Sequence, residues 1–193
     1  MISFKRSMAD YSDEQLIKDY LEGNKQTLEV LIGRYLKPIY GFVYRYLGDA
    51  HNAEDVTQDV FVKIWRNLKK FDRDKNFKTW IFTIAKNTCL DFLKKKRTVV
   101  FSEYETEDGE NYLADNIADL SPLPPEILER TDIAQMLSAV MQKLSPEHRV
   151  VLFLHYNDHL TFREIAEALE EPIHTVKSRH RRALIMLRKL LDT

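Results

Sequence analysis

The chain has 193 residues, of which 31% are charged and 44% hydrophobic, and its formal net charge at pH 7 is −1. This composition is typical of a folded globular protein, and it excludes membrane insertion because no apolar run approaches the roughly 18–20 residues that a span needs. The single cysteine, Cys89, excludes an internal disulfide and a thiolate zinc site; we find no secretory signal and expect a reducing, cytoplasmic location with no cofactor.

The first part of the chain predicts two helices. Glycine is scarce, with 5 residues, which argues against phosphate-binding loops and β-hairpins and favours an all-α fold. Ser12 can cap the first helix, with Gln15 as the second member of a capping box. The second helix has apolar residues at spacings of three and four from about Lys25 to Leu47. Pro38 should kink or split it, and Gly48-Asp49 is a stop signal.

A third helix is predicted from a cap at Asn52 to Leu68. Its core face carries Val56, Val60, Phe61, Ile64 and Leu68. The residues that fall largely off this face are Glu54, Asp55, Gln58, Asp59 and Val62. Carboxylates in a first turn suit the helix dipole, so good capping explains them. An exposed acidic helix start can also dock a basic partner helix, and both interpretations stay open at this point.

The fourth helix, Lys78 to Arg97, mixes cations with aromatic rings. One face of this helix can pack against the core through Trp80, Ile81, Ile84, Ala85, Thr88 and Cys89. A second face carries Lys78, Phe82, Lys86 and Asn87. Rings beside cations are what single-stranded nucleic acid needs, since each stacked base contributes about 1–3 kcal/mol and cations hold the phosphates. The alternative is that Trp80 and Phe82 are ordinary core residues.

Charge is strongly segregated along the chain. From Lys63 to Arg97 there are 12 Lys or Arg against 3 Asp, a balance of +9. Residues 98–125 hold 7 Asp or Glu and no cation, a balance of −7, whereas residues 172–193 hold 6 cations and 1 Asp, a balance of +5. Two basic blocks favour a nucleic-acid partner through counterion release. The acidic, proline-containing stretch predicts a linker over 98–125 between an N-terminal helical domain, 1–97, and a smaller one, 126–193.

The C-terminal part predicts a helix-turn-helix. A helix over 126–143 is followed by one that Ser145 caps and Asn157-Asp158 ends. Thr161 and Glu164 form a capping box for the next helix. After the turn at 170–172, a basic helix should bury Val176, Ala183, Leu184 and Leu187 and expose Thr175, Lys177, Ser178, Arg181 and Arg182. Such a helix can enter the major groove, where Arg and Lys donate to guanine edges.

The order of motifs resembles the extracytoplasmic-function (ECF) group of bacterial sigma factors. The stretches that carry the resemblance are Ala53–Phe61, Phe77–Asn87, Leu144–Arg149, Leu160–Ala166 and Thr175–Arg179. The resemblance implies two small helical domains joined by an acidic linker. It also implies that the chain is no enzyme, but a factor that binds RNA polymerase core, directs it to promoters and helps to open the DNA.

The resemblance also implies a role for each surface. The clamp coiled coil of core polymerase would be bound by Glu54, Asp55, Gln58, Asp59 and Val62, and the polymerase flap would be a second contact of the protein. The minus-ten element would be opened by Arg73, Lys75, Lys78, Trp80, Lys86, Asn87, Lys94 and Arg97, with one base flipped into a pocket. The duplex minus-thirty-five element would be read by Thr175, Lys177, Ser178, Arg179, Arg181 and Arg182. The linker would thread towards the RNA exit path, and an anti-sigma factor would bind the free protein.

Other functions are weaker fits. His155 and His159 stand four apart, but no third metal ligand is obvious, so we predict no metal site. A DNA-binding response regulator has a similar helix-turn-helix but needs an α/β receiver domain, and a pure adaptor needs no basic recognition helix. The chain departs from the family where members often carry glycine, because Glu170 or Glu171 stands in the turn and His174 precedes the recognition motif.

Overall fold

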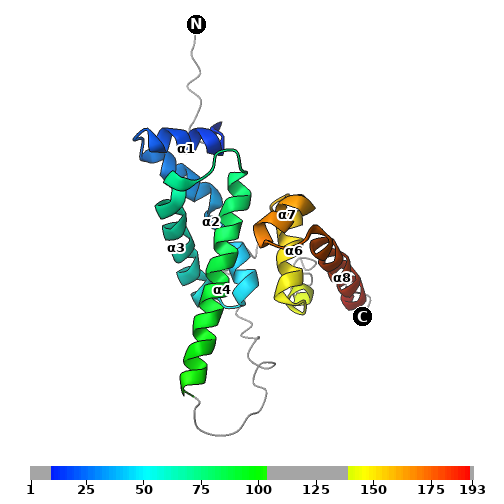
Figure 1. Ribbon diagram of the computed structural model, residues 1–193. Helices are drawn as coiled ribbons and strands as arrows, with labels where there is room; N and C mark the ends of the chain where they lie inside the picture. Colours follow the sequence, from blue (N-terminus) through cyan, green and yellow to red (C-terminus); the bar gives the residue numbers. More distant parts are fainter. Residues whose placement is uncertain (1–9, 104–138, 192–193) are drawn as a thin grey trace.

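The structure is a computed structural model that describes residues 10–103 and 139–191. Within these residues every regular element is a helix, as the scarcity of glycine and the apolar periods predict (Figure 1). The N-terminal helices are α1 (Asp13–Leu21), α2 (Gln26–Leu47), α3 (Ala50–Asn67) and α4 (Phe77–Glu103), with a 3-10 turn at Leu68–Lys70. The C-terminal helices are α6 (Pro146–Tyr156), α7 (Phe162–Leu169) and α8 (Ile173–Leu191).

Helix caps explain most of the N-terminal boundaries. The Ser12 side chain accepts a hydrogen bond from the Gln15 amide, but the Gln15 side chain donates to Asp19, 2.6 Å away, instead of completing a capping box. The prediction that Asn52 caps α3 is wrong, because Asp49 is the cap and accepts from the Asn52 amide at 2.6 Å. Gly48 ends α2 in a left-handed conformation, which glycine adopts without steric penalty.

Helix α2 continues through Pro38 from Gln26 to Leu47, so the proline does not split it. A proline inside a helix removes one backbone hydrogen bond and costs roughly 3 kcal/mol. Helix α2 packs against α1, α3, α4 and α6, and this burial on both sides of Pro38 offsets that cost. Helix α2 is therefore the element that α1, α3, α4 and α6 share (Figure 1).

The N-terminal core lies between α2, α3 and α4. The predicted α3 face is correct, since Val56, Val60 and Ile64 are buried. Of the two interpretations of Phe82, the core one is correct, because its ring is fully buried and lies 5.3 Å from the ring of Phe42. The aromatic period that suggested a nucleic-acid surface at Phe82 is thus a packing signal, and burying a ring of this size is favourable by several kcal/mol.

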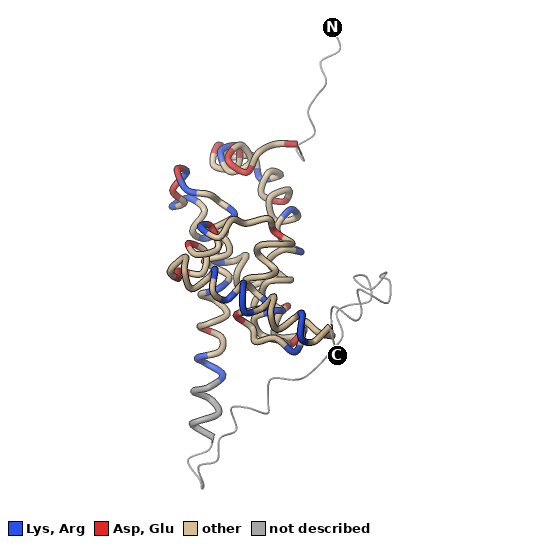
Figure 2. Tube along the Cα trace, turned by 90° about the vertical axis from the view of Figure 1, so that its right-hand side faces the viewer, with Lys and Arg blue, Asp and Glu red and all other residues tan. Residues whose placement is uncertain are grey.

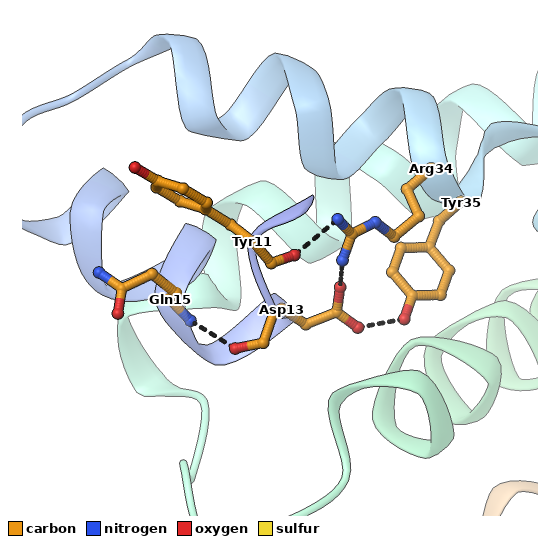
Figure 3. A network of polar contacts seen from close by, with 6 residues as sticks. Tyr11, Asp13, Gln15, Arg34 and Tyr35 are labelled. Atoms are coloured by element: carbon orange, nitrogen blue, oxygen red, sulfur yellow. Dashed lines mark hydrogen bonds and ion pairs between the residues drawn. The ribbon is translucent and has the colours of Figure 1, made fainter. Parts of the chain in front are cut away.

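A polar network fastens α1 across α2 (Figure 3). Arg34 pairs with the Asp13 carboxylate and also donates to the Tyr11 carbonyl at 2.8 Å. The Tyr35 hydroxyl donates to the other Asp13 oxygen. Burial, the hydrogen bond to Asp13 and the negative charge of Asp13 raise the pKa of Tyr35, so the phenol stays a neutral donor. The network fixes the direction of α1 across the bundle.

Helix α4 extends further than the sequence predicts. The helix expected to end at Arg97 continues to Glu103, so the start of the predicted linker 98–125 is helical. The segment Thr98–Glu103 contains neither glycine nor proline, and nothing local stops the helix. The rest of that linker and most of the helix predicted over 126–143 lie outside the described residues; residues 139–142 are helical.

The C-terminal unit is a helix-turn-helix with one departure from prediction. The capping box at the start of α7 is present, with Thr161 and Glu164 each satisfying the other's backbone amide. Val176 and Ala183 of α8 are buried, but Leu184 is 40% exposed and does not belong to the core. The buried face of α8 is short because only α6 and α7 cover it among the described elements.

The two units pack against each other. Helix α6 lies on α2, and α7 lies on α4 (Figure 1). At the α2–α6 contact, a Cβ added to Gly41 would meet the Phe153 ring at 3.0 Å, and the Arg45 guanidinium sits 4.2 Å from the centre of that ring. The core is consequently continuous from Leu16 of α1 to Val176 of α8.

The caps generate a test of stability. We expect Thr161→Ala to lower the free energy of unfolding by about 1 kcal/mol, because it removes the side-chain acceptor at the start of α7. Ser145→Ala is the matched control, since Ser145 caps α6 without a side-chain bond to the backbone. Urea denaturation followed by circular dichroism measures both losses. Equal losses in the two variants would contradict this role of Thr161.

Candidate nucleic-acid and polymerase interfaces

The outer face of α3 is acidic with an apolar centre. All five residues predicted to bind a partner here are exposed, namely Glu54, Asp55, Gln58, Asp59 and Val62. Trp65 extends this face, with its ring 52% exposed and its indole N–H donating to the Tyr20 hydroxyl at 2.9 Å. Sequence reasoning missed Trp65, although it stands three residues after Val62 and so lies beside it on the helix. The carboxylates lie on the N-terminal side of the apolar pair Val62 and Trp65, whereas Lys63 and Arg66 lie beside Val62 on the other side. An apolar patch with carboxylates along one side suits a basic protein surface.

A groove of ≈ 400 Å³ runs beside this face between α3 and α4. Its apolar wall includes Val62 and Phe92, and its rim carries charges of both signs. Lys63 of α3 reaches Asp91 of α4, with 3.3 Å between the ammonium nitrogen and the carboxylate. Lys94, predicted to bind DNA, lies on the rim of the groove. The groove therefore connects the predicted polymerase face with the cationic part of α4.

The residues predicted for the minus-ten element do not form one open surface. Arg73 and Lys75 are exposed in the loop before α4, and Lys94 is exposed further along the helix. Trp80 is half-buried and leans on Phe71 and Phe77, with ring centres 4.9 Å and 5.6 Å away. The side chain of Arg97 lies outside the described residues. The open part of this surface is thus the loop and the flank of α4.

The remaining residues of this set meet the C-terminal unit. The Lys78 ammonium lies 3.1 Å from the Asp158 carboxylate and donates to the Asp158 carbonyl at 2.6 Å. The Lys86 ammonium lies 2.8 Å from the Glu170 carboxylate, and the Asn87 side chain hydrogen-bonds the same glutamate. Two of the predicted phosphate ligands are therefore paired with carboxylates of the helix-turn-helix unit.

The electrostatics of the two pairs differ. Burial raises the pKa of Asp158, although the Lys78 charge and hydrogen bond act in the opposite direction. The hydrogen bond from Lys86 lowers the pKa of Glu170, which is more exposed. Sequence reasoning missed both carboxylates as partners of α4, because nothing local pairs residues that are 80 and 84 positions apart.

The basic face of α8 is the other open cationic surface (Figure 2). Lys177, Arg181 and Arg182 are exposed, whereas Thr175 and Ser178 are half-buried. Arg179 is also half-buried and pairs with Glu171 of the turn, so this arginine helps to fix the angle between α7 and α8. Three of the six predicted residues, Lys177, Arg181 and Arg182, are thus exposed for bases and phosphates along one helix, together with the half-buried hydroxyl groups of Thr175 and Ser178.

Aromatic and imidazole rings anchor α8 to α6 and α7. His155 stacks on Phe162 with ring centres 4.7 Å apart, and its Nδ1 lies 3.0 Å from the Leu160 carbonyl. His180 of α8 meets the same rings, and burial lowers its pKa. His155 is thus a packing residue of this cluster. In the described ranges no group of three or more His, Cys, Asp or Glu is placed to hold a metal ion.

Cys89 lies in the N-terminal core and is fully buried. Burial raises the pKa of its thiol to about 12, so the reactive thiolate is not populated near neutral pH. We also find no helix, among residues 10–103 and 139–191, that is long and apolar enough to cross a bilayer.

Comparisons with known proteins identify the family of the chain. The Sigma-70 region 2 family matches residues 31–99, and the Sigma-70 region 4 family matches residues 134–187. The ECF RNA polymerase sigma factor SigW of Bacillus subtilis is 32% identical over 91% of this chain and 94% of its own length. The RNA polymerase sigma-H factor of Pseudomonas aeruginosa is 31% identical over 93% of this chain and 94% of its own.

Solved structures share the fold. The sigma factor RpoE of Bartonella quintana, in complex with the anti-sigma factor NepR, matches with a TM-score of 0.67 and 23% identity over 91% of this chain and 98% of that one. CnrH, in complex with the cytosolic domain of CnrY, matches with a TM-score of 0.63 and 23% identity over 93% of this chain and 97% of that one. Both likenesses concern the arrangement of helices.

Proposed function

The chain belongs to the ECF sigma factors of bacterial RNA polymerase, and we propose a residue-level division of labour for its promoter recognition. Residues 1–97 bind core polymerase and the minus-ten element, and residues 126–193 bind the minus-thirty-five element. Of the segment 98–125, the part that follows the end of α4 at Glu103 serves as the linker. As in the family, the protein gives core polymerase its promoter selectivity and has no reaction of its own. A response regulator is not favoured, because both family matches are to sigma factors and the described residues contain no strand.

The exposed α3 face carries the polymerase part of this proposal. Glu54, Asp55 and Asp59 supply carboxylates on the N-terminal side of Val62, which is 42% exposed. We place the clamp coiled coil of polymerase core on this face. Buried contact at the apolar centre gives affinity, and the carboxylates steer a basic partner into register. Trp65, beside Val62, adds a large ring to the same docking surface.

We assign promoter opening to the loop before α4 and to the exposed flank of α4. Separating DNA strands costs about 1.4 kcal/mol per base-pair step, and stacking of an unpaired base on an aromatic ring returns about 1–3 kcal/mol. Trp80 is half-buried on Phe71 and Phe77, so one side of the ring is fixed by packing. Arg73, Lys75 and Lys94 then hold the phosphates of the separated strand.

Duplex recognition falls to α8. Lys177, Arg181 and Arg182 are exposed on a helix that α6 and α7 hold from behind. This geometry suits insertion into the major groove of the minus-thirty-five element. The C-terminal unit is also where we place the polymerase flap. An anti-sigma factor is a further proposed partner, because the sigma factor RpoE of Bartonella quintana was solved with the anti-sigma factor NepR, and we propose a cytoplasmic location with the polymerase.

Run-off transcription with purified core polymerase on a genomic library tests the function directly. We expect the wild-type chain to produce discrete start sites, and a Glu54→Ala, Asp55→Ala, Asp59→Ala variant to bind core roughly tenfold more weakly (about 1.4 kcal/mol). The matched control replaces three other exposed carboxylates, at Glu22, Glu29 and Glu167, with alanine. Equal loss of co-elution with core in both variants would contradict a specific α3 face.

Duplex recognition has its own prediction. We expect Arg181→Ala, Arg182→Ala to weaken binding to a duplex promoter fragment by roughly tenfold or more, since each base or phosphate contact is worth about 1–3 kcal/mol. Lys25→Ala, Lys37→Ala removes the same charge from exposed positions on the N-terminal unit and should change affinity less than about twofold. Fluorescence anisotropy at fixed salt measures both. If both variants lost affinity to a similar extent, the binding would be non-specific charge attraction and the proposed role of Arg181 and Arg182 would be wrong.

Strand opening is tested at Trp80. We expect Trp80→Leu to reduce permanganate reactivity of promoter thymines several-fold, while Trp80→Tyr keeps most of it, because both variants fill the contact with Phe71 and Phe77 but only tyrosine can stack on a base. Co-elution with core polymerase should be unchanged in both. If the leucine variant opens promoters as well as the tyrosine variant does, the stacking role of Trp80 is wrong.

A further inference from the structure

The Trp65 ring on α3 is exposed, yet a residue of a neighbouring helix holds it. The side chain is 52% exposed and stands beside Val62 on the outer face of α3. Its indole N–H donates to the hydroxyl of Tyr20 of α1, with 2.9 Å between the indole nitrogen and the hydroxyl oxygen. Tyr20 itself is half-buried and packs against the main core. The ring is therefore open to solvent, while its orientation is tied to α1.

Helix α1 is a firm support for this contact because it is fixed to α2. Its inner face carries Leu16 and Ile17, both of which are buried in the core, and the Asp13 network fixes its direction across α2 (Figure 3). Tyr20 follows Leu16 and Ile17 by four and three residues, so it lies on the same face of the helix. The hydrogen bond therefore connects Trp65 of α3 to a helix that α2 already holds in place.

Fixing the ring before a partner arrives strengthens binding. A solvent-exposed side chain changes rotamer within picoseconds to nanoseconds, and immobilising it at an interface costs free energy when the partner binds. The Tyr20 hydroxyl restricts the ring in the free chain, so this cost is reduced. It also satisfies the indole N–H, which is the only polar group of the side chain, so the partner need only cover the apolar ring. Trp65 is therefore preorganised as an anchor of the α3 face.

We propose that Tyr20 of α1 is a positioning residue for polymerase docking, because its hydroxyl holds the Trp65 ring in the orientation in which that ring binds core polymerase. This inference rests on the proposed function of the α3 face. It extends the determinants of docking from α3 to α1, whose sequence carries no signal for a polymerase contact. Tyr20 acts through Trp65 and needs no contact with the polymerase itself, whereas Val62 and the carboxylates of α3 keep their direct roles.

A double-mutant cycle on the full-length chain tests this role. Tyr20→Phe removes the hydroxyl and keeps the ring that packs on the core, and Trp65→Phe keeps a ring on α3 but removes the indole N–H. The measured quantity is the Kd of the fluorescently labelled chain for purified core polymerase. We expect Tyr20→Phe to weaken binding roughly fivefold in the wild-type background. In the Trp65→Phe background it should change the Kd less than about 1.5-fold, because the hydroxyl then has no indole to hold.

The fluorescence of Trp65 gives a second readout that a general loss of stability would not produce. The chain has two tryptophans, so Trp80→Tyr leaves Trp65 as the only indole. In this background Tyr20→Phe should increase the amplitude of subnanosecond ring motion in the anisotropy decay, with helix content by circular dichroism unchanged. Tyr11→Phe is the matched control, because Tyr11 joins the α1 network through its backbone carbonyl, which the substitution leaves in place. The control should change neither the ring motion nor the Kd.

Four results would each overturn the positioning role of Tyr20. They are a Trp65→Phe variant that binds core as tightly as wild type, equal losses from Tyr20→Phe in both backgrounds, weaker binding without faster ring motion, and a loss in Tyr11→Phe as large as that in Tyr20→Phe. Run-off transcription separates this inference from the proposed function. A wild-type chain that neither binds core nor directs transcription would refute the function, whereas an active chain with an additive cycle would refute only the role of Tyr20.

Discussion

The contact between α2 and α6 is the constraint on which the arrangement of the molecule depends. Gly41 has no side chain, and this absence lets the Phe153 ring lie directly on α2 under the Arg45 guanidinium. Because α2 also supports α1, α3 and α4, this one approach places the helix-turn-helix relative to every N-terminal surface. The positions of Asp158 and Glu170 against α4 follow from it, and so does the exposure of the α3 face.

The ion pairs that accompany this contact are individually weak. A solvent-exposed ion pair such as Lys86–Glu170 contributes about 0–1 kcal/mol, and the more buried Lys78–Asp158 pair loses in desolvation much of what it gains in attraction. Since both units belong to one chain, even weak contacts act at a high effective concentration. The ion pairs therefore contribute little to the free energy that separating the two units costs, and apolar packing such as that of the buried Phe153 contributes more.

Local sequence patterns correctly predicted the features that depend on residues close together in the chain. The apolar periods located the helices, and the five exposed residues of α3 and the Thr161–Glu164 capping box were predicted correctly. Competing local signals caused the errors. Asp49, not Asn52, caps α3, and Leu184 lies outside the core. For Phe82 the sequence left two interpretations open, and the structure places its ring in the core. The contact between the two units could not be predicted, because it joins residues that are far apart in the sequence. It depends on the fit of side chains, such as the Phe153 ring in the space at Gly41, and apolar periodicity carries no information about that fit.

The placement of charged residues explains how a DNA-binding chain can have a near-zero net charge. A net charge of −1 would argue against a DNA-binding protein if charges were mixed evenly. Here cations are gathered on α4 and α8, and carboxylates of the C-terminal unit neutralise part of the α4 set. Salt screens these pairs and the attraction of the cations for DNA phosphates alike, so raised ionic strength weakens both. The apolar packing of Phe153 is not screened, so it holds the two units together where salt weakens the ion pairs.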